Sequence, residues 1–242
     1  MFEALYVTKA ALYIGAGISM GFGAIGAAVG EGYTAGAANE AISFRPEKAG
    51  EVVKNMLIGQ AIAESAAIFA LVIAIMMVFN DSPGENYIQA WTYIGAGCSM
   101  GLAAIGSGIG SGFPAGKLCI GVVRQPAYSG KLLTTTLIGA AVCQTPAILG
   151  MVVALLLLFG DYSAIPLYPG WAAMLGAGLA AGFGGIGPGI GEGMVAGSAV
   201  KAISRNTTAS DVLTRTMLVG MAVTESTSVY ALVVALLLII SI

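Results

Sequence analysis

Long runs of apolar residues alternate along the chain with short polar segments. Each run exceeds the roughly 20 residues that a helix needs to cross about 30 Å of hydrocarbon. The pattern predicts an all-α membrane protein with six transmembrane helices, joined by short turns into three tandem helical hairpins. The expected helices are residues 4–41, 53–79, 87–122, 131–159, 168–203 and 211–240.

One pattern recurs three times, at a spacing of 80 to 81 residues. Ile14–Gly26, Ile94–Gly106 and Leu175–Gly187 begin the successive copies, and each copy continues into a second apolar run. Direct repeats of this kind indicate one structural unit used three times. The expected hairpin domains are residues 1–82, 83–163 and 164–242.

Composition restricts the class of protein. Of the 242 residues, 57% are hydrophobic and 9% are charged, and there is no His. An ordinary soluble domain has about 25% charged residues, so the composition argues against that class. The lack of a basic face argues against a nucleic-acid partner. The three Cys stand alone, without the CxxC spacing of a zinc site, and we interpret them as small packing residues.

The 36 glycines concentrate in the first helix of each hairpin. The pairs Gly26/Gly30 and Gly32/Gly36 have the G-xxx-G spacing through which membrane helices approach closely. A dinucleotide-binding loop would need a strand before the glycines, whereas these lie within an apolar helix. We therefore expect the first helices to pack tightly together in an inner ring.

Positive charges indicate the orientation in the membrane. Nine of the ten Lys and Arg residues lie in or beside the three turns within the hairpins. Positive residues are enriched in cytoplasmic loops, so we expect these turns in the cytoplasm. Both termini, and the links at Asp81 and Asp161, should then face the outer side of a cell membrane. The nine residues are Arg45, Lys48, Lys54, Lys117, Arg124, Lys131, Lys201, Arg205 and Arg215.

Four of the twelve acidic residues lie deep within apolar runs. Glu31 and Glu64 are 33 residues apart and centred on the first turn, and Glu192 and Glu225 have the same spacing in the third hairpin. The two members of each pair are therefore expected at the same depth. A charge at mid-bilayer costs roughly 2.5–3.5 kcal/mol, which implies a function for these carboxyl groups.

The middle hairpin carries neutral polar groups at the two equivalent positions, Ser111 and Gln144. Both acids are replaced together in this hairpin, as expected for two ligands of one shared site. Gln144 cannot change its charge, and we therefore expect two ion-carrying hairpins out of three. The residues of the degenerate site in the middle repeat are Ser111, Val142, Gln144 and Thr145.

Further oxygen donors accompany the second-helix acids, since a hydroxyl follows each of them in Glu64-Ser65 and Glu225-Ser226. A backbone carbonyl two residues earlier can join them where it is locally free. Such donors suit a small hard cation, so we interpret the sites as Na⁺ sites in which one Glu of each pair stays protonated. A proton is the alternative cargo, although it would leave the extra oxygens unused. The expected metal ligands are Glu31, Ile62, Glu64, Ser65, Glu192, Val223, Glu225, Ser226 and Thr227.

The chain resembles the c subunit, or proteolipid, of rotary ATPases, in a triple-hairpin, sodium-binding form similar to A-type and V-type rotor rings. The resemblance rests on GPGIGEGMVAG at Gly187–Gly197, on Arg124-Gln-Pro126 at a turn, and on GQAIAES at Gly59–Ser65 and TESTSVY at Thr224–Tyr230 in second helices. These motifs cover all three repeats. They imply a closed rotor ring of identical chains and a non-catalytic, ion-translocating role.

The resemblance also implies roles for individual residues. Glu64 and Glu225 correspond to the ion-carrying carboxylate, while Glu31 and Glu192 occupy a first-helix position that is often Gln in the sodium-binding branch. In the family the site is assembled from neighbouring hairpins. By position, Ser65 and Ser226 match the hydroxyl ligand, and Ile62 and Val223 match the carbonyl ligand.

Partners follow from the same resemblance. A membrane stator subunit is expected to supply an Arg that displaces the ion, and central-stalk subunits to contact the turns at Arg45, Arg124 and Arg205. An ion-loaded, neutral site would return through lipid. Two ions per three hairpins favour an A-type or V-type machine that pumps.

Three departures from the family pattern affect the interpretation of the chain as a rotor-ring subunit. Gln144 replaces the carboxylate in the middle repeat, Pro146 interrupts that helix just after it, and the first turn reads Phe44-Arg45-Pro46. A secondary cation transporter is the rival function, but such proteins usually contain inverted repeats. A structural scaffold gives no account of acids matched in depth.

Overall fold

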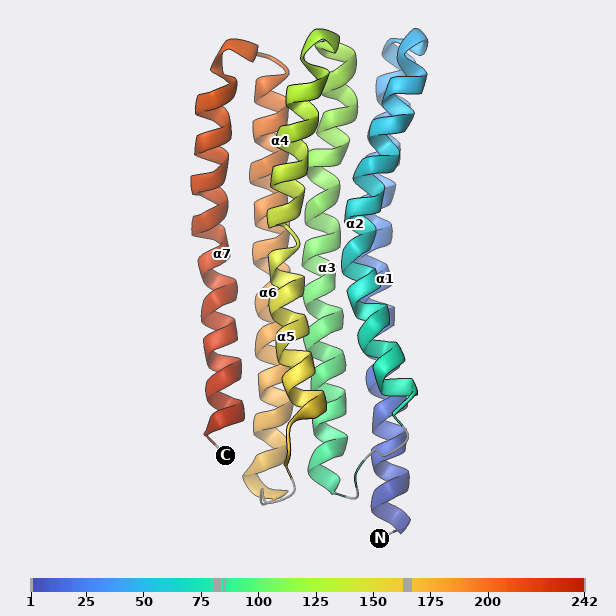
Figure 1. Ribbon diagram of the computed structural model, residues 1–242, viewed down its shortest axis with the longest axis vertical. Helices are drawn as coiled ribbons and strands as arrows, with labels where there is room; N and C mark the ends of the chain where they lie inside the picture. Colours follow the sequence, from blue (N-terminus) through green and yellow to red (C-terminus); the bar gives the residue numbers. More distant parts are fainter. Residues whose placement is uncertain (1, 81–83, 85, 163–166, 242) are drawn as a thin grey trace.

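The computed structural model describes residues 2–80, 84, 86–162 and 167–241. The expected domain boundaries at 82/83 and 163/164, and the link residue Asp81, lie outside these residues. The chain forms a bundle of long, nearly parallel helices (Figure 1). The three short turns lie at one end of the bundle, and both ends of the chain lie at the other (Figure 1).

The described helices confirm the prediction of six spans in three hairpins, because six helical segments are long and apolar enough to cross a membrane. One of these segments comprises two shorter helices. The helices are α1 (Phe2–Phe44), α2 (Ala49–Val78), α3 (Tyr87–Arg124), α4 (Ser129–Val142), α5 (Thr145–Phe159), α6 (Leu167–Ile203) and α7 (Ser210–Ile240).

A proline residue determines the shape of two of the three turns. Arg45 and Gln125 adopt non-helical conformations, with φ of −144° and −132°, because a residue that precedes proline is disfavoured in the α region. Pro46 and Pro126 then each begin a single 3₁₀ turn that leads into the next helix. The third turn has the same shape at Asn206 and Thr207–Ala209, without a proline.

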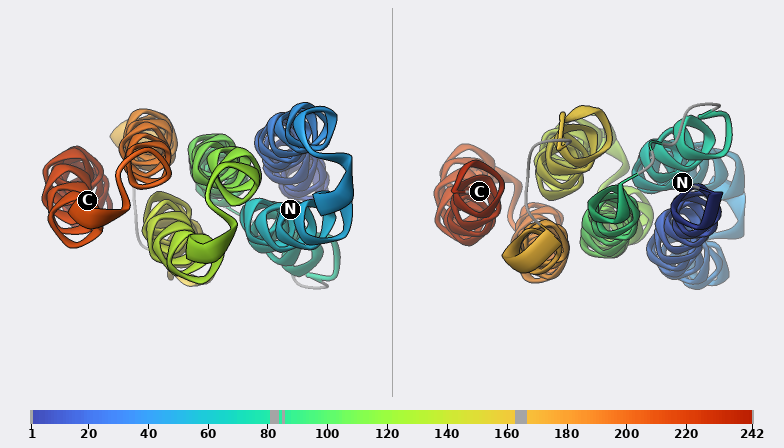
Figure 2. Two further views of the ribbon diagram at one scale, coloured as in Figure 1. Left: turned by 90° about the horizontal axis from the view of Figure 1, so that it is seen from above. Right: turned by 90° about the horizontal axis from the view of Figure 1, so that it is seen from below.

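The helices form two rows, which the end-on views show clearly (Figure 2). The three first helices, α1, α3 and α6, lie side by side in one row. Their contact is backbone against backbone: a Cβ added at Gly108 would lie 2.5 Å from the carbonyl carbon of Gly26, and one added at Gly189 would lie 2.5 Å from that of Gly106. Only glycine permits this approach, so the expected crowding of the first helices is present within the chain.

The second helices lie over the grooves between the first helices. α2 contacts α1 and α3, whereas α4 and α5 contact α3 and α6. α7 lies at one lateral edge of the bundle, against α6 and α5. The arrangement places the second helix of each of the first two hairpins next to the hairpin that follows.

The prediction of one continuous helix at residues 131–159 is wrong, because the structure has two helices there, α4 and α5. It breaks at Cys143 and Gln144, and Pro146 lies in the first turn of α5. The sequence suggested an interruption just after Gln144, whereas the break includes this residue. Proline is tolerated in the first turn of a helix but cannot donate to the carbonyl four residues earlier, so the break precedes it.

Candidate functional site

The best-formed acidic site lies between α6 and α7. Glu192 is fully buried, and both of its carboxylate oxygens lack a hydrogen-bond donor among the described residues. Its carboxyl group lies beside that of Glu225, whose Oε2 also lacks a donor among these residues. Ser228 donates to Oε1 of Glu225 at 2.9 Å. Two carboxyl groups in this setting need a proton or a cation between them.

The second acidic pair lies at the outer edge of the bundle, on α1 and α2. Glu31 is half-buried and Glu64 is exposed, and the two carboxyl groups interact electrostatically. Gln60 Nε2 donates to the backbone oxygen of Glu31 at 3.3 Å. The hydrogen bonds of this pair differ from those of Glu192 and Glu225, since Ala67 stands where α7 has Ser228. The pair also lacks the cover that the second helix of a preceding hairpin would give.

The middle hairpin holds a hydrogen-bonded amide at the corresponding place. Nε2 of Gln144 donates to Oγ of Ser111 at 2.7 Å and to the backbone oxygen of Ile62 at 3.1 Å. Ile62 belongs to the preceding hairpin, so this contact joins two hairpins. The amide nitrogen thus occupies the position where a cation would have to lie to contact the same two oxygens.

The hydroxyl groups expected as ligands donate to their own helices. Ser65 donates to the oxygen of Ala61 at 3.1 Å, and Ser226 to that of Val223 at 2.7 Å. Thr227 likewise bonds Thr224. A hydroxyl that donates in this way keeps its oxygen lone pairs available, so each can still act as a ligand.

Two functional residues were missed by sequence reasoning. Ser107 Oγ accepts a hydrogen bond from the backbone N–H of Ala147 at 3.1 Å, and Ser228 contacts Glu225. The spacing of Ser107, one helical turn before Ser111, could have indicated the first. Nothing in the sequence distinguishes Ser228 from other serines of an apolar helix.

The donors fit a hard cation better than a transition metal. Among the described residues, no group of three or more His, Cys, Asp or Glu side chains converges. A cation at either acidic pair would therefore need neutral oxygens from hydroxyl groups and backbone carbonyls in addition to the two carboxyl groups. Sets of oxygen donors of this kind bind hard cations.

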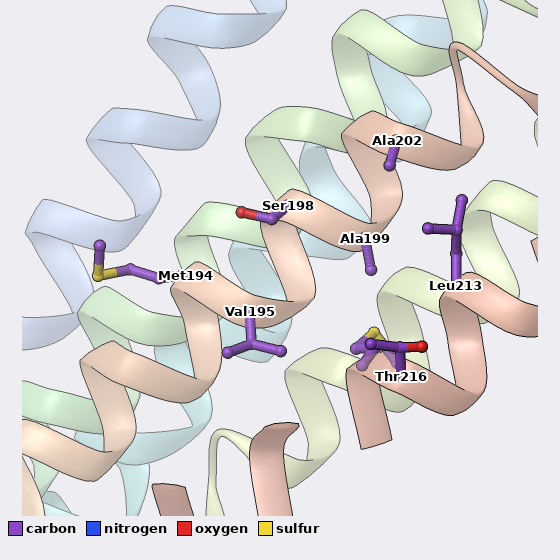
Figure 3. Close-up of a pocket in the computed structure, with 8 residues that line it drawn as sticks. Met194, Val195, Ser198, Ala199, Ala202, Leu213 and Thr216 are labelled. Carbon is purple, nitrogen blue, oxygen red and sulfur yellow. The ribbon is translucent and has the colours of Figure 1, made fainter. Parts of the chain in front are cut away.

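The two lateral edges of the bundle, formed by α1 and by α6 with α7, carry open surfaces. On α1, a Cβ added at Gly17, Gly32 or Gly36 would meet nothing within 4 Å, although the equivalent glycines of α3 and α6 are packed. On the opposite lateral edge, an open groove of about 440 Å³ lies between α6 and α7 (Figure 3). Its lining residues are Met194, Val195, Ser198, Ala199, Ala202, Leu213, Thr216 and Met217.

Met194 at this groove is the third-repeat equivalent of two aromatic residues. Tyr33 packs over Gly116, and Phe113 packs over Gly197. Met194 is 59% exposed. By the same repeat spacing, the glycine on which it would pack is Gly36, which lies on α1 at the opposite lateral edge of the bundle. Within one chain these two surfaces cannot meet.

The positive residues at the turns are open to partners. Arg45, Arg124 and Arg205 are all exposed, at the same end of the bundle. The remaining basic residue, Lys9, lies near the opposite end. The structure thus places the charge asymmetry of the sequence along the axis of the bundle.

Comparison with known families identifies each hairpin. The family model that describes the ATP synthase c subunit matches the chain three times, at residues 14–77, 94–157 and 175–238. Each match includes the second-helix position that holds Glu64, Gln144 or Glu225.

Single-hairpin relatives show the same similarity. The ATP synthase c subunit of Natranaerobius thermophilus is 49% identical over 78 residues, which are 32% of this chain and 90% of the relative. That of Sulfurovum sp. is 36% identical over 93 residues, 38% of this chain and 92% of the relative. That of Clostridium botulinum is 44% identical over 75 residues, 31% and 94% respectively.

Proposed function

Because the chain belongs to the ATP synthase c subunit family, it is a non-catalytic, ion-translocating rotor subunit, and we propose that the ion is Na⁺, carried at two sites per chain. The observation that supports this proposal is that the fully buried carboxyl group of Glu192 lies beside that of Glu225, and that three of their four oxygens have no hydrogen-bond donor among the described residues. The equivalent pair is Glu31 and Glu64.

Charge balance argues for one Na⁺ and one proton at each pair. Two ionised carboxylates around a single Na⁺ would leave a negative charge in a low-dielectric site, where an unpaired charge is very costly. If one carboxyl group keeps its proton, the loaded site is neutral. A neutral site can turn through lipid, whereas an empty ionised site cannot.

The stator then controls loading and release. A cationic stator residue, an Arg by analogy with the family, would pair with the carboxylate of Glu64 or Glu225 and displace the ion. The ion leaves through one half-channel, and a new one enters from the other. Gln144 takes no part in this exchange, because its amide already bonds Ile62 and Ser111 and cannot ionise.

The ring places the two sites differently. Cys143, at the break between α4 and α5, packs against α6 and α7 near Glu192 and Glu225, whereas Glu64 is exposed at the edge of the bundle. We assign the missing cover to α7 of the neighbouring copy, whose Val223 is 69% exposed. The packing of Met194 of one copy on Gly36 of the next would close the ring.

The remaining assignments follow from charge and repeat spacing. The three hairpin units are residues 1–82, 83–163 and 164–242. The basic turns face the cytoplasm and contact the central stalk through Arg45, Arg124 and Arg205, and both termini face outward. Two ions per three hairpins require more free energy per ion in synthesis, so we assign the chain to an A-type or V-type pump.

Carbodiimide labelling of the intact ring tests the choice of ion. The reagent attacks protonated carboxyl groups in apolar sites, so Glu64 and Glu225 should be modified, and Na⁺ should slow both reactions at constant pH. Peptide mass spectrometry assigns the modified residue. A labelling rate that does not depend on Na⁺ but falls as the pH rises would instead identify H⁺ as the transported ion.

A further inference from the structure

The break between α4 and α5 has its own set of supporting residues. Pro146 has no N–H for the carbonyl of Val142, and the N–H of Ala147 turns to Ser107 Oγ, at 3.1 Å, instead of to Cys143. Ser111 in turn donates to the oxygen of Ser107 at 2.8 Å and accepts from Gln144. The break is therefore held by side chains of α3.

Two successive backbone carbonyls lose their helical partners as a result. Among the hydrogen bonds of the described residues, none reaches the oxygen of Val142 or that of Cys143. Buried carbonyls are nearly always paired, so an unpaired one deep in the membrane is expensive unless something binds it. A cation is one such partner.

The repeat register indicates which site these carbonyls face. Gln144 of the second hairpin reaches the carbonyl of Ile62 in the first. Moving one repeat along replaces this pair by Glu225 and the carbonyl of Val142. Cys143, next to Val142, packs against α6 and α7 and lies close enough to Glu192 and Glu225 to interact with both.

The other acidic pair has no such break beside it. The residues equivalent to Pro146 are Ala66 in α2 and Thr227 in α7, and both helices run on without interruption. The carbonyl of Val223, which is equivalent to Val142, therefore keeps the N–H of Thr227 as its helical partner. The residue equivalent to Ser107 is Ala27 in the first repeat and Pro188 in the third.

We propose that Pro146 is a positioning residue that makes the two ion sites of each chain unequal. By freeing the carbonyl of Val142, it gives the Glu192–Glu225 site a stronger neutral oxygen ligand and a higher affinity for Na⁺ than the Glu31–Glu64 site. The inference rests on the proposed transport of Na⁺. It makes the middle hairpin, which carries no ion itself, a contributor to the site of the next.

The test measures Na⁺ protection at both carboxyl groups in the same intact ring. In the parent ring, half-protection of Glu225 from carbodiimide should need less Na⁺ than half-protection of Glu64. Pro146→Ala restores the N–H and should raise the concentration for Glu225 roughly tenfold, the low end for loss of a supporting interaction at a metal site. Glu64 in the same sample should not change.

Pro114→Ala is the matched control, because Pro114 lies inside α3 without breaking it. It should leave the ratio between the two sites unaltered. Equal protection of the two carboxyl groups in the parent ring, an unchanged Glu225 in Pro146→Ala, or an equal shift at both sites would overturn the inference while leaving Na⁺ transport standing. Absence of Na⁺ protection at both sites in the parent ring would overturn the proposed function and this inference with it.

Discussion

Gln144 and Ile62 are 82 residues apart in sequence, and the side-chain amide of the first donates to the backbone carbonyl of the second at 3.1 Å. This bond links the second helices of two hairpins at the depth of the acidic pairs. It shows how the second helix of one hairpin reaches the carbonyl of the preceding one. The relationship also accounts for the neutral middle repeat, because the amide supplies contacts that we propose an ion makes in the other repeats.

Gln144→Glu should add a third carboxyl group that reacts with carbodiimide, raising the count from two to three per chain. The variant should also lose stability by about 1–3 kcal/mol, since a protonated carboxyl group has one O–H and can donate to only one of the two acceptors, Ile62 O and Ser111 Oγ. Intact-mass spectrometry counts the labels, and heating in detergent compares the stability of the rings. A variant as stable as the parent would contradict the role assigned to this amide.

Glu64→Gln and Glu225→Gln should each reduce the count of reactive carboxyl groups from two to one. Each substitution leaves two neutral second-helix positions of three, so Na⁺ transport coupled to ATP hydrolysis should fall sharply in both. Uptake of ²²Na⁺ into inverted vesicles measures it. Glu51→Gln, at the start of α2, where the carboxylate pairs with Lys48 far along the helix from Glu64, is the control and should transport normally.

Glycine substitutions should separate folding of the chain from closure of the ring. Gly112→Ala places a methyl group against the backbone of Gly30 within the chain, and overpacking of this kind costs about 1–3 kcal/mol. Gly32→Ala, at the equivalent position on the open face of α1, should leave the chain folded but weaken its contact with a second copy.

Native mass spectrometry in mild detergent distinguishes the two effects. Gly32→Ala should shift the population from closed rings toward single chains and open arcs. Gly50→Ala, where an added Cβ also meets nothing within 4 Å but which lies beside the first turn, should preserve the ring. Rings of unchanged size and stability in Gly32→Ala would rule out α1 as the closing surface.

Cysteine labelling should settle the orientation. Thr208→Cys, at the exposed third turn, should react with an impermeant maleimide in inverted vesicles and resist it in right-side-out ones. Glu3→Cys, exposed at the opposite end, should behave in the reverse way. Two of the native thiols, Cys119 and Cys143, are fully buried and should give little background. The opposite result at both positions would invert the proposed topology.

The sequence by itself determined the membrane class, the three hairpins and the four acidic positions. These features depend on local chemistry: apolar length sets a span, proline sets a turn, and spacing about a turn sets depth. It also located Gln144 and Pro146 as departures from the repeat, since a repeated sequence supplies its own reference.

Only the tertiary structure decided which hairpin contacts which. Three features depend on the register between helices. They are the hydrogen bond from Gln144 to Ile62, the hydrogen bond from Ala147 to Ser107 at the helix break, and the contrast between buried Glu192 and exposed Glu64. That register comes from the contact of glycine backbones between neighbouring helices. Small residues can mesh at several offsets along a helix, so packing across the whole interface selects one of them.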